Sequence, residues 1–437
     1  MENIKRNFGF GCMRLPMCGD EVDIEQFKQM VDMFLARGFR YFDTAHGYLY
    51  GKSELAIREA LTSRYPRGSY ILTNKLTGNF FEKEEDIRPL FEQQLEACGV
   101  EYFDFYLMHA QSANNYPHFR KCRAYETAFA LKREGKVRHV GISFHDSPEM
   151  LERILGDYPE IEAVQIQFNY LDYDDPAIQS RAVYETARKF GKPVIIMEPV
   201  KGGRLVELPE EAEKVLASLG GGSPASYALR FAAGFEGVMM VLSGMSDLTQ
   251  MEDNCSFMAA FKPLDARERS AVEEVQRIFK TKNFIPCTAC RYCTPGCPAH
   301  IEIPDIFATV NARKLHERWD ARAHYAALCE KAGSRASDCV GCGQCESVCP
   351  QHLRSARCSG MRRANLSETH KKRKSGGCCL IAAAPALLFQ RRSRLCGMPG
   401  KAEWGEGHPA SSQSKIAFLA MRSPYSAFQR RCGSQTS

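Results

Sequence analysis

The feature that most constrains the fold is a regular alternation of two sequence patterns over residues 8–260. Short runs rich in β-branched and aromatic residues alternate with stretches in which apolar residues recur every three or four positions, as on one face of a helix. The runs expected to form strands are 8–12, 39–42, 70–72, 103–107, 137–142, 163–166, 194–197 and 238–242, and the helical pattern is clearest at 24–36, 54–65, 86–98, 124–133, 178–190 and 226–233. Eight strand–helix units in about 250 residues predict an α/β fold of the closed (β/α)8, or TIM, barrel type.

An open, doubly wound parallel sheet is the alternative to a barrel. Such a sheet holds a dinucleotide on a glycine-rich turn after its first strand, and no such turn follows residues 8–12. We therefore expect a barrel domain over residues 1–262. Residues 263–353 are expected to form a linker helix and a small, mostly helical cysteine-rich domain, and residues 354–437 a non-globular basic tail.

Polar residues end three consecutive predicted strands of the barrel. These residues are Asp43, Lys75 and His109, and Tyr48 lies five positions after the aspartate. Because catalytic side chains of barrel enzymes lie at the C-terminal ends of the strands, the four side chains are expected to meet at one mouth. A phenol keeps its proton at pH 7, and a cation such as Lys75 would lower its pKa, so the set predicts a proton-transfer site.

The segment around these residues resembles the aldo-keto reductase family. Residues 43–48 (DTAHGY) and 51–54 (GKSE) are similar to the family signature, and Lys75 and His109 fall at the other positions of its catalytic tetrad. The resemblance covers roughly residues 8–260. It implies that Tyr48 is the general acid, with Tyr50 as a second candidate, and that a small carbonyl or alcohol is the substrate.

The same resemblance implies a nicotinamide cofactor, NADPH or NADH, extended across the barrel mouth. The residues that it assigns to cofactor binding are Ser143, Gln165, Met197, Gly202, Gly203, Arg204 and Asn254. Glycines let backbone N–H groups approach a pyrophosphate, and Lys201 would add charge. Residues 243–254 carry no basic side chain for a 2′-phosphate, so the choice between the two dinucleotides stays open.

The most specific pattern in the chain is a repeated cysteine motif. The spacing Cys-x2-Cys-x2-Cys-x3-Cys-Pro occurs at residues 287–298 and again at 339–350. It resembles bacterial ferredoxins with two 4Fe–4S clusters, in which the fourth cysteine of each run ligates the other cluster. The resemblance implies one cluster on Cys287, Cys290, Cys293 and Cys349, and a second on Cys339, Cys342, Cys345 and Cys297.

Zinc and disulfides are the other uses of such cysteines. Structural zinc also favours paired Cys-x2-Cys, but two complete runs that each end in Cys-Pro exceed what zinc requires. Disulfides are rare in a reducing cytoplasm. We therefore favour the iron–sulfur interpretation.

The net charge of +6 comes from the tail alone. Residues 354–437 contain 16 basic and 3 acidic residues, whereas the rest of the chain contains 42 and 49. The parts that carry chemistry are thus acidic, and we expect no nucleic-acid partner. The tail is interpreted as a disordered basic arm or, preferably, the product of a reading-frame error, because related ferredoxin extensions continue with Pro-Ile-Arg-Glu at residue 354.

The leading hypothesis is an oxidoreductase of aldo-keto reductase type that is coupled to or associated with two 4Fe–4S clusters and uses a redox partner protein. The alternatives are an iron–sulfur electron-transfer protein whose barrel is a docking or sensing module, and a zinc-stabilised scaffold. No apolar run is long enough to span a bilayer, and residues 1–7 lack the apolar stretch of a secretory signal. We therefore expect a cytoplasmic protein with no membrane partner.

Overall fold

The computed structural model describes residues 7–315 and 320–355. Eight parallel strands close into a barrel in the order β1-β10-β9-β8-β7-β6-β5-β4, and two further short strands pair as a hairpin. The barrel strands are β1 (Phe8–Gly11), β4 (Tyr41–Asp43), β5 (Ile71–Leu76), β6 (Phe103–Gln111), β7 (Val137–Phe144), β8 (Ala163–Gln167), β9 (Val194–Met197) and β10 (Val238–Ser243). The hairpin is β2 (Met17–Cys18) and β3 (Glu21–Val22).

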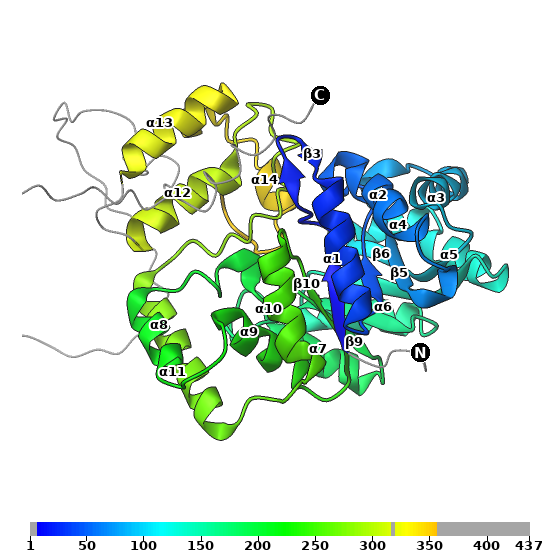
Figure 1. Cartoon of the computed structure of the whole chain (residues 1–437). Helices are drawn as coiled ribbons and strands as arrows, with labels where there is room; N and C mark the ends of the chain where they lie inside the picture. The colour runs from blue at the N-terminus through cyan, green and yellow to red at the C-terminus, as the bar shows by residue number, and fades with distance from the viewer. Residues whose placement is uncertain (1–6, 316–319, 356–437) are drawn as a thin grey trace, which may run out of the picture. The chain divides into compact units, whose positions relative to one another are not determined.

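Helices surround this ring of strands (Figure 1). They are α1 (Ile24–Ala36), α2 (Lys52–Ile57), α3 (Glu84–Cys98), α4 (Tyr116–Lys121), α5 (Ala124–Arg133), α6 (Pro148–Asp157), α7 (Ser180–Lys189), α8 (Glu210–Ala217), α9 (Pro224–Ala233), α10 (Leu248–Ala259) and α11 (Ala266–Lys282). Each predicted strand overlaps one strand of the barrel, so the predicted barrel is confirmed.

Alternation along the strands decides which side chains enter the barrel. The interior is filled by Tyr41, Phe105, Leu107, Ala163, Ile195, Met240 and Leu242. Successive side chains of a strand point to opposite faces, so residues two positions further along β4 and β6, Asp43 and His109, face the same interior. Thr73 of β5 donates a hydrogen bond to the Tyr41 hydroxyl at 2.7 Å, and Lys75 follows it by two. The pleat therefore directs three of the predicted catalytic side chains into one space.

Helix α11 packs on the barrel although the sequence suggested a linker. Its buried residues Val272, Val275 and Phe279 share a core with residues of α8 and α9. Arg230 of α9 donates two hydrogen bonds to the Glu268 carboxylate, at 2.8 and 2.7 Å. The barrel's packing thus extends beyond residue 262.

The cysteine-rich segment has a core of its own. Its helices are α12 (Ile303–Leu315), α13 (Ala321–Ala332) and α14 (Gln344–Ser347), and its buried residues include Ile301, Ile306, Phe307 and Tyr325. Barrel and cysteine-rich segment belong to one compact unit. Apart from its first two residues, the predicted basic tail lies outside the described residues.

Within the described residues, no helix has the length and apolar character needed to cross a membrane.

Candidate active site and cysteine cavities

Lys75 and Asp43 form a buried ion pair at the carboxyl end of the barrel. Lys75 Nζ lies 2.5 Å from Asp43 Oδ1 and donates a second hydrogen bond to the Thr44 carbonyl oxygen at 2.8 Å. Burial lowers the pKa of Lys75, and the charge of Asp43 and its hydrogen bond raise it. A buried ammonium without such a partner is costly, so Asp43 keeps the lysine charged and fixes its direction.

Tyr48 is the first residue of a tight turn, Tyr48–Gly51. The aromatic ring of Tyr48 lies beside the Lys75 ammonium. Leu49 and Tyr50 both have left-handed backbone angles, φ 51° and 58°. Lys75 Nζ lies 4.9 Å from the centre of the Tyr48 ring, whereas the Tyr50 side chain is 81% exposed. The geometry therefore favours Tyr48 over Tyr50 as the acid.

The pKa of Tyr48 is raised, whereas the sequence suggested that Lys75 would lower it. Burial is the main effect, and together with the negative charge of Asp43 it raises the pKa of Tyr48, while a hydrogen bond with Tyr292 lowers it. Lys75 Nζ lies 4.9 Å from the centre of the same ring. The phenol consequently holds its proton, as a general acid must before the reaction.

His109 lies where β6 and β7 lose their regular register, between Met108 and Gln111. Such bulges redirect side chains. Its Nδ1 is 2.7 Å from the Thr77 hydroxyl. Burial, followed by the charge of Lys75, lowers the pKa of His109 well below its usual range, so the ring is neutral. When Thr77 donates to Nδ1, Nε2 carries the hydrogen.

Three of the predicted cofactor residues bond to other parts of the barrel. The Ser143 hydroxyl accepts from the Ala110 amide at 2.7 Å, Gln165 donates to Asp43 at 3.0 Å, and Asn254 donates to Ser243 at 3.1 Å. Ser143 and Gln165 thus lie beside the catalytic group.

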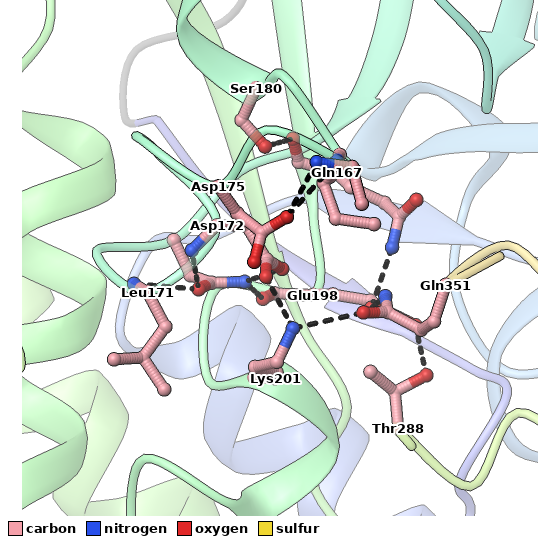
Figure 2. Close-up of polar contacts among 12 residues, drawn as sticks. Gln167, Leu171, Asp172, Asp175, Ser180, Glu198, Lys201, Thr288 and Gln351 are labelled. Carbon is pink, nitrogen blue, oxygen red and sulfur yellow. Dashed lines mark hydrogen bonds and ion pairs between the residues drawn. The ribbon is translucent and has the colours of Figure 1, made fainter. Parts of the chain in front are cut away.

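The predicted pyrophosphate loop instead contacts the cysteine-rich segment (Figure 2). The buried ammonium of Lys201 pairs with Asp172 and donates to the Gln351 side chain at 2.9 Å. Glu198 accepts from the Thr288 hydroxyl at 2.8 Å and from Gln351 at 3.2 Å. Lys201 therefore has carboxylate and amide partners where the sequence suggested a phosphate.

Two other members of the expected pyrophosphate site also face that segment. A side chain on Gly202 would collide with the Thr288 carbonyl oxygen, whereas Gly203 has open space. Arg204 lies over the Phe284 ring at 5.0 Å, and Met197 at the end of β9 is half-buried. In this arrangement the backbone of Thr288 lies against Gly202, where the sequence suggested a pyrophosphate.

The eight motif cysteines line two cavities. One is lined by Cys287, Cys290, Cys293, Cys345 and Cys349. The other is lined by Cys297, Cys339, Cys342 and Cys345. Each cavity thus brings together three cysteines of one run and the fourth cysteine of the other, and Cys345 lines both cavities.

Metal loading of these cavities depends on how closely the ligating side chains approach one another and on the protonation of the thiols. Among residues 7–315 and 320–355, no three His, Cys, Asp or Glu side chains converge tightly enough to hold one ion. Burial raises the pKa of Cys287 to about 11 and that of Cys293 to about 12. Loading with metal must therefore release protons from these thiols.

Comparison with known proteins finds a match for the barrel and another for the cysteine-rich segment. The model of the aldo/keto reductase family matches residues 7–277. The chain belongs to the aldo/keto reductase family. A 4Fe-4S dicluster domain matches residues 286–354, so this family member carries an iron–sulfur domain after its barrel.

Curated relatives match the barrel only in part. The NADH-specific methylglyoxal reductase of Escherichia coli is 30% identical over 154 residues, 31% of this chain and 45% of that protein. An aldo-keto reductase of Melia azedarach, for 7-acetyl-epi-neemfruitin B, is 28% identical over 37% of this chain and 52% of its own length. The chain thus spans about half of these relatives.

Solved structures share the barrel. The holo form of an aldo-keto reductase from Bacillus halodurans is 25% identical with a TM-score of 0.52, covering 62% of this chain and 91% of its own. A Klebsiella pneumoniae aldo-keto reductase in complex with NADPH has a TM-score of 0.50 at 18% identity over 62% and 90% of the two chains. The second likeness concerns the fold alone.

The site contains residues that sequence reasoning missed. Tyr292, Thr288 and Gln351 come from the cysteine-rich segment and contact His109, Glu198 and Lys201. Their proximity to motif cysteines was visible in the sequence, but nothing in the spacing shows that they face the barrel.

Proposed function

We propose that the chain reduces small carbonyl compounds to alcohols, or catalyses the reverse oxidation, with Tyr48 as general acid and NADPH or NADH as cofactor. The observation that carries the proposal is the convergence of Tyr48, Lys75 and His109 at one end of the barrel, with centroids of the tyrosine and histidine rings 5.9 Å apart and the lysine over the tyrosine ring. The association of this site with two 4Fe–4S clusters is part of the same proposal.

The residues of the chain account for the proton transfer. Tyr48 holds its proton and donates it to the substrate oxygen as negative charge develops there. The Lys75 ammonium, held by Asp43, stabilises the phenolate that remains. Neutral His109 offers its Nε2–H to the same oxygen. Reduced nicotinamide would supply a hydride when bound, and Ser143 and Gln165 would contact it.

The cysteine cavities give the second half of the proposal. Each offers four thiolates to one cluster, and a bound 4Fe–4S cluster supplies electrons singly. Thiolate-ligated clusters are compatible with a reducing compartment, and we place the protein in the cytoplasm with a redox protein as partner.

A second candidate function is electron transfer with the barrel as a docking or sensing module. It is favoured by one observation, that Thr288 covers the Gly202 loop where a dinucleotide pyrophosphate was expected. Titration of the anaerobically purified protein with NADH and NADPH tests it. Binding of either dinucleotide in the micromolar range would contradict the hypothesis that the barrel binds no nucleotide.

Replacing Tyr48 with Phe tests the leading function. Removal of the general acid is expected to lower kcat with methylglyoxal and NADH or NADPH by about 10²- to 10⁴-fold. The matched control is Tyr50→Phe, two positions away and exposed, which is expected to keep the wild-type rate. Equal rates for wild type and Tyr48→Phe would remove Tyr48 from the mechanism.

A further inference from the structure

The cysteine-rich domain places one of its side chains inside the catalytic group of the barrel. Tyr292 lies between the cluster cysteines Cys290 and Cys293 in the sequence, yet its hydroxyl is 3.4 Å from His109 Nε2. The same hydroxyl hydrogen-bonds with that of Tyr48. The rings of Tyr292 and His109 meet edge-on, with centroids 6.2 Å apart. Tyr292 thus touches both groups that would bind a substrate oxygen.

The loop that carries Tyr292 is held by ion pairs on its own domain. Arg291 has a left-handed backbone, φ 62°, and its guanidinium binds Glu302 at 2.7 Å and Asp305 at 2.6 Å. Because both carboxylates belong to the start of α12 and the turn before it, the residue next to Tyr292 is fixed to the cysteine-rich domain.

The barrel holds the other end of this loop. Arg14 donates to the carbonyl oxygen of buried Thr288 at 2.6 Å, and the Thr288 side chain donates to Glu198. Two independent anchors therefore define where the Tyr292 hydroxyl lies, which is the condition for a side chain that orients a ligand.

We propose that Tyr292 is a third hydrogen-bonding residue of the carbonyl site, so that the cysteine-rich domain completes the substrate pocket of the barrel. This inference rests on the proposed function. A carbonyl oxygen gains a third lone pair as it becomes an alkoxide during reduction, and a carboxylate offers about four acceptor sites. Such a group can therefore accept from the Tyr48 hydroxyl, His109 Nε2–H and the Tyr292 hydroxyl together. Tyr292 supplies the third of these donors, from outside the barrel.

The position of Tyr292 also links the substrate site to the first cysteine cavity. Its neighbours Cys290 and Cys293 line that cavity, so a ligand that moves the Tyr292 hydroxyl changes the surroundings of the group bound there. Occupancy of the barrel site is therefore expected to alter the EPR spectrum of the reduced iron–sulfur protein.

The experiment compares Tyr292→Phe with Tyr325→Phe in the full-length, cluster-loaded protein. Tyr325 is the matched control, because its hydroxyl accepts a hydrogen bond from the Ala336 amide within the cysteine-rich domain, at 3.0 Å. Benzoate is the probe, since its carboxylate offers the acceptor oxygens but is not reduced. Iron content equal to wild type shows that each variant is folded and loaded.

Loss of one hydrogen bond predicts that Tyr292→Phe weakens benzoate binding and raises KM for methylglyoxal by about three- to tenfold. Benzoate should change the EPR spectrum of the wild type and of Tyr325→Phe, but not that of Tyr292→Phe. Unchanged benzoate affinity in Tyr292→Phe overturns the proposal. Tighter binding also overturns it, because the hydroxyl would then occupy the site rather than serve it. Benzoate binding needs no turnover, so these results stand apart from the Tyr48→Phe test.

Discussion

Burial sets the protonation of single residues at the barrel mouth, in directions that suit their proposed roles. It lowers the pKa of Lys75 and of His109 and raises that of Tyr48. Only Lys75 has a carboxylate partner that opposes the effect of burial. The site therefore combines one charged cation with a neutral imidazole and a protonated phenol.

The lowered pKa of His109 predicts how stability depends on pH. An unfolded histidine titrates near pH 6.5, so below that pH the unfolded chain binds a proton that the folded chain does not. The free energy of unfolding should then fall as the pH drops from about 6.5, by at most about 1.4 kcal/mol per pH unit for one such group. Urea unfolding of the anaerobic protein at several pH values between 7.5 and 5.5 measures this change in the free energy of unfolding.

The variant His109→Gln separates the contribution of His109 to this pH dependence from the contributions of other titratable groups. His145 also has a pKa lowered by burial, so part of the slope should persist. The variant should nonetheless show a shallower loss of stability with acid than the wild type. Identical slopes would show that folding does not lower the pKa of His109.

At the scale of elements, close approach between strands β7 and β8 makes a second prediction. A Cβ added to Gly141 of β7 would lie 2.6 Å from the Ala163 carbonyl oxygen and 2.7 Å from a Leu107 methyl. Gly141→Ala should therefore destabilise the barrel by about 1–3 kcal/mol. Gly156 of α6 has open space around it, so Gly156→Ala should be neutral or stabilising by up to about 1 kcal/mol. The test compares the urea midpoints of Gly141→Ala and Gly156→Ala. Equal midpoints would contradict the prediction that the β7–β8 contact excludes a side chain at residue 141.

The elements show what sequence could predict. The strand runs, the strand-end positions of Asp43, Lys75 and His109, and the grouping of the cysteines all depend on local periodicity or spacing, and the structure has each of them. Packing of α11 on the barrel and the contact of Tyr292 with His109 depend on residues far apart in the chain. Local patterns carry no signal for such contacts.

At the scale of the whole molecule, a few polar contacts join the cysteine-rich segment to the barrel. Arg14 holds the Thr288 carbonyl oxygen, Lys201 holds Gln351, and Asn114 donates to the Ser347 carbonyl oxygen at 3.4 Å. Only Gly202 allows the backbone of Thr288 to approach its loop so closely. The junction therefore depends on a residue that contributes no side chain.

A pair of alanine substitutions tests this junction. Gly202 and Gly203 both have left-handed backbones, φ 66° and 94°, so alanine at either position carries a similar strain of about 1 kcal/mol. Only Gly202→Ala also drives a Cβ into the Thr288 carbonyl oxygen. It should loosen the loop that holds Cys287 and Cys290 and speed the loss of iron to an added chelator several-fold. Gly203→Ala should lose iron at the wild-type rate, because no atom beyond its chain neighbours lies within 4 Å of its added Cβ. Equal rates for the two variants would mean that the iron–sulfur domain holds its metal independently of its contact with the barrel.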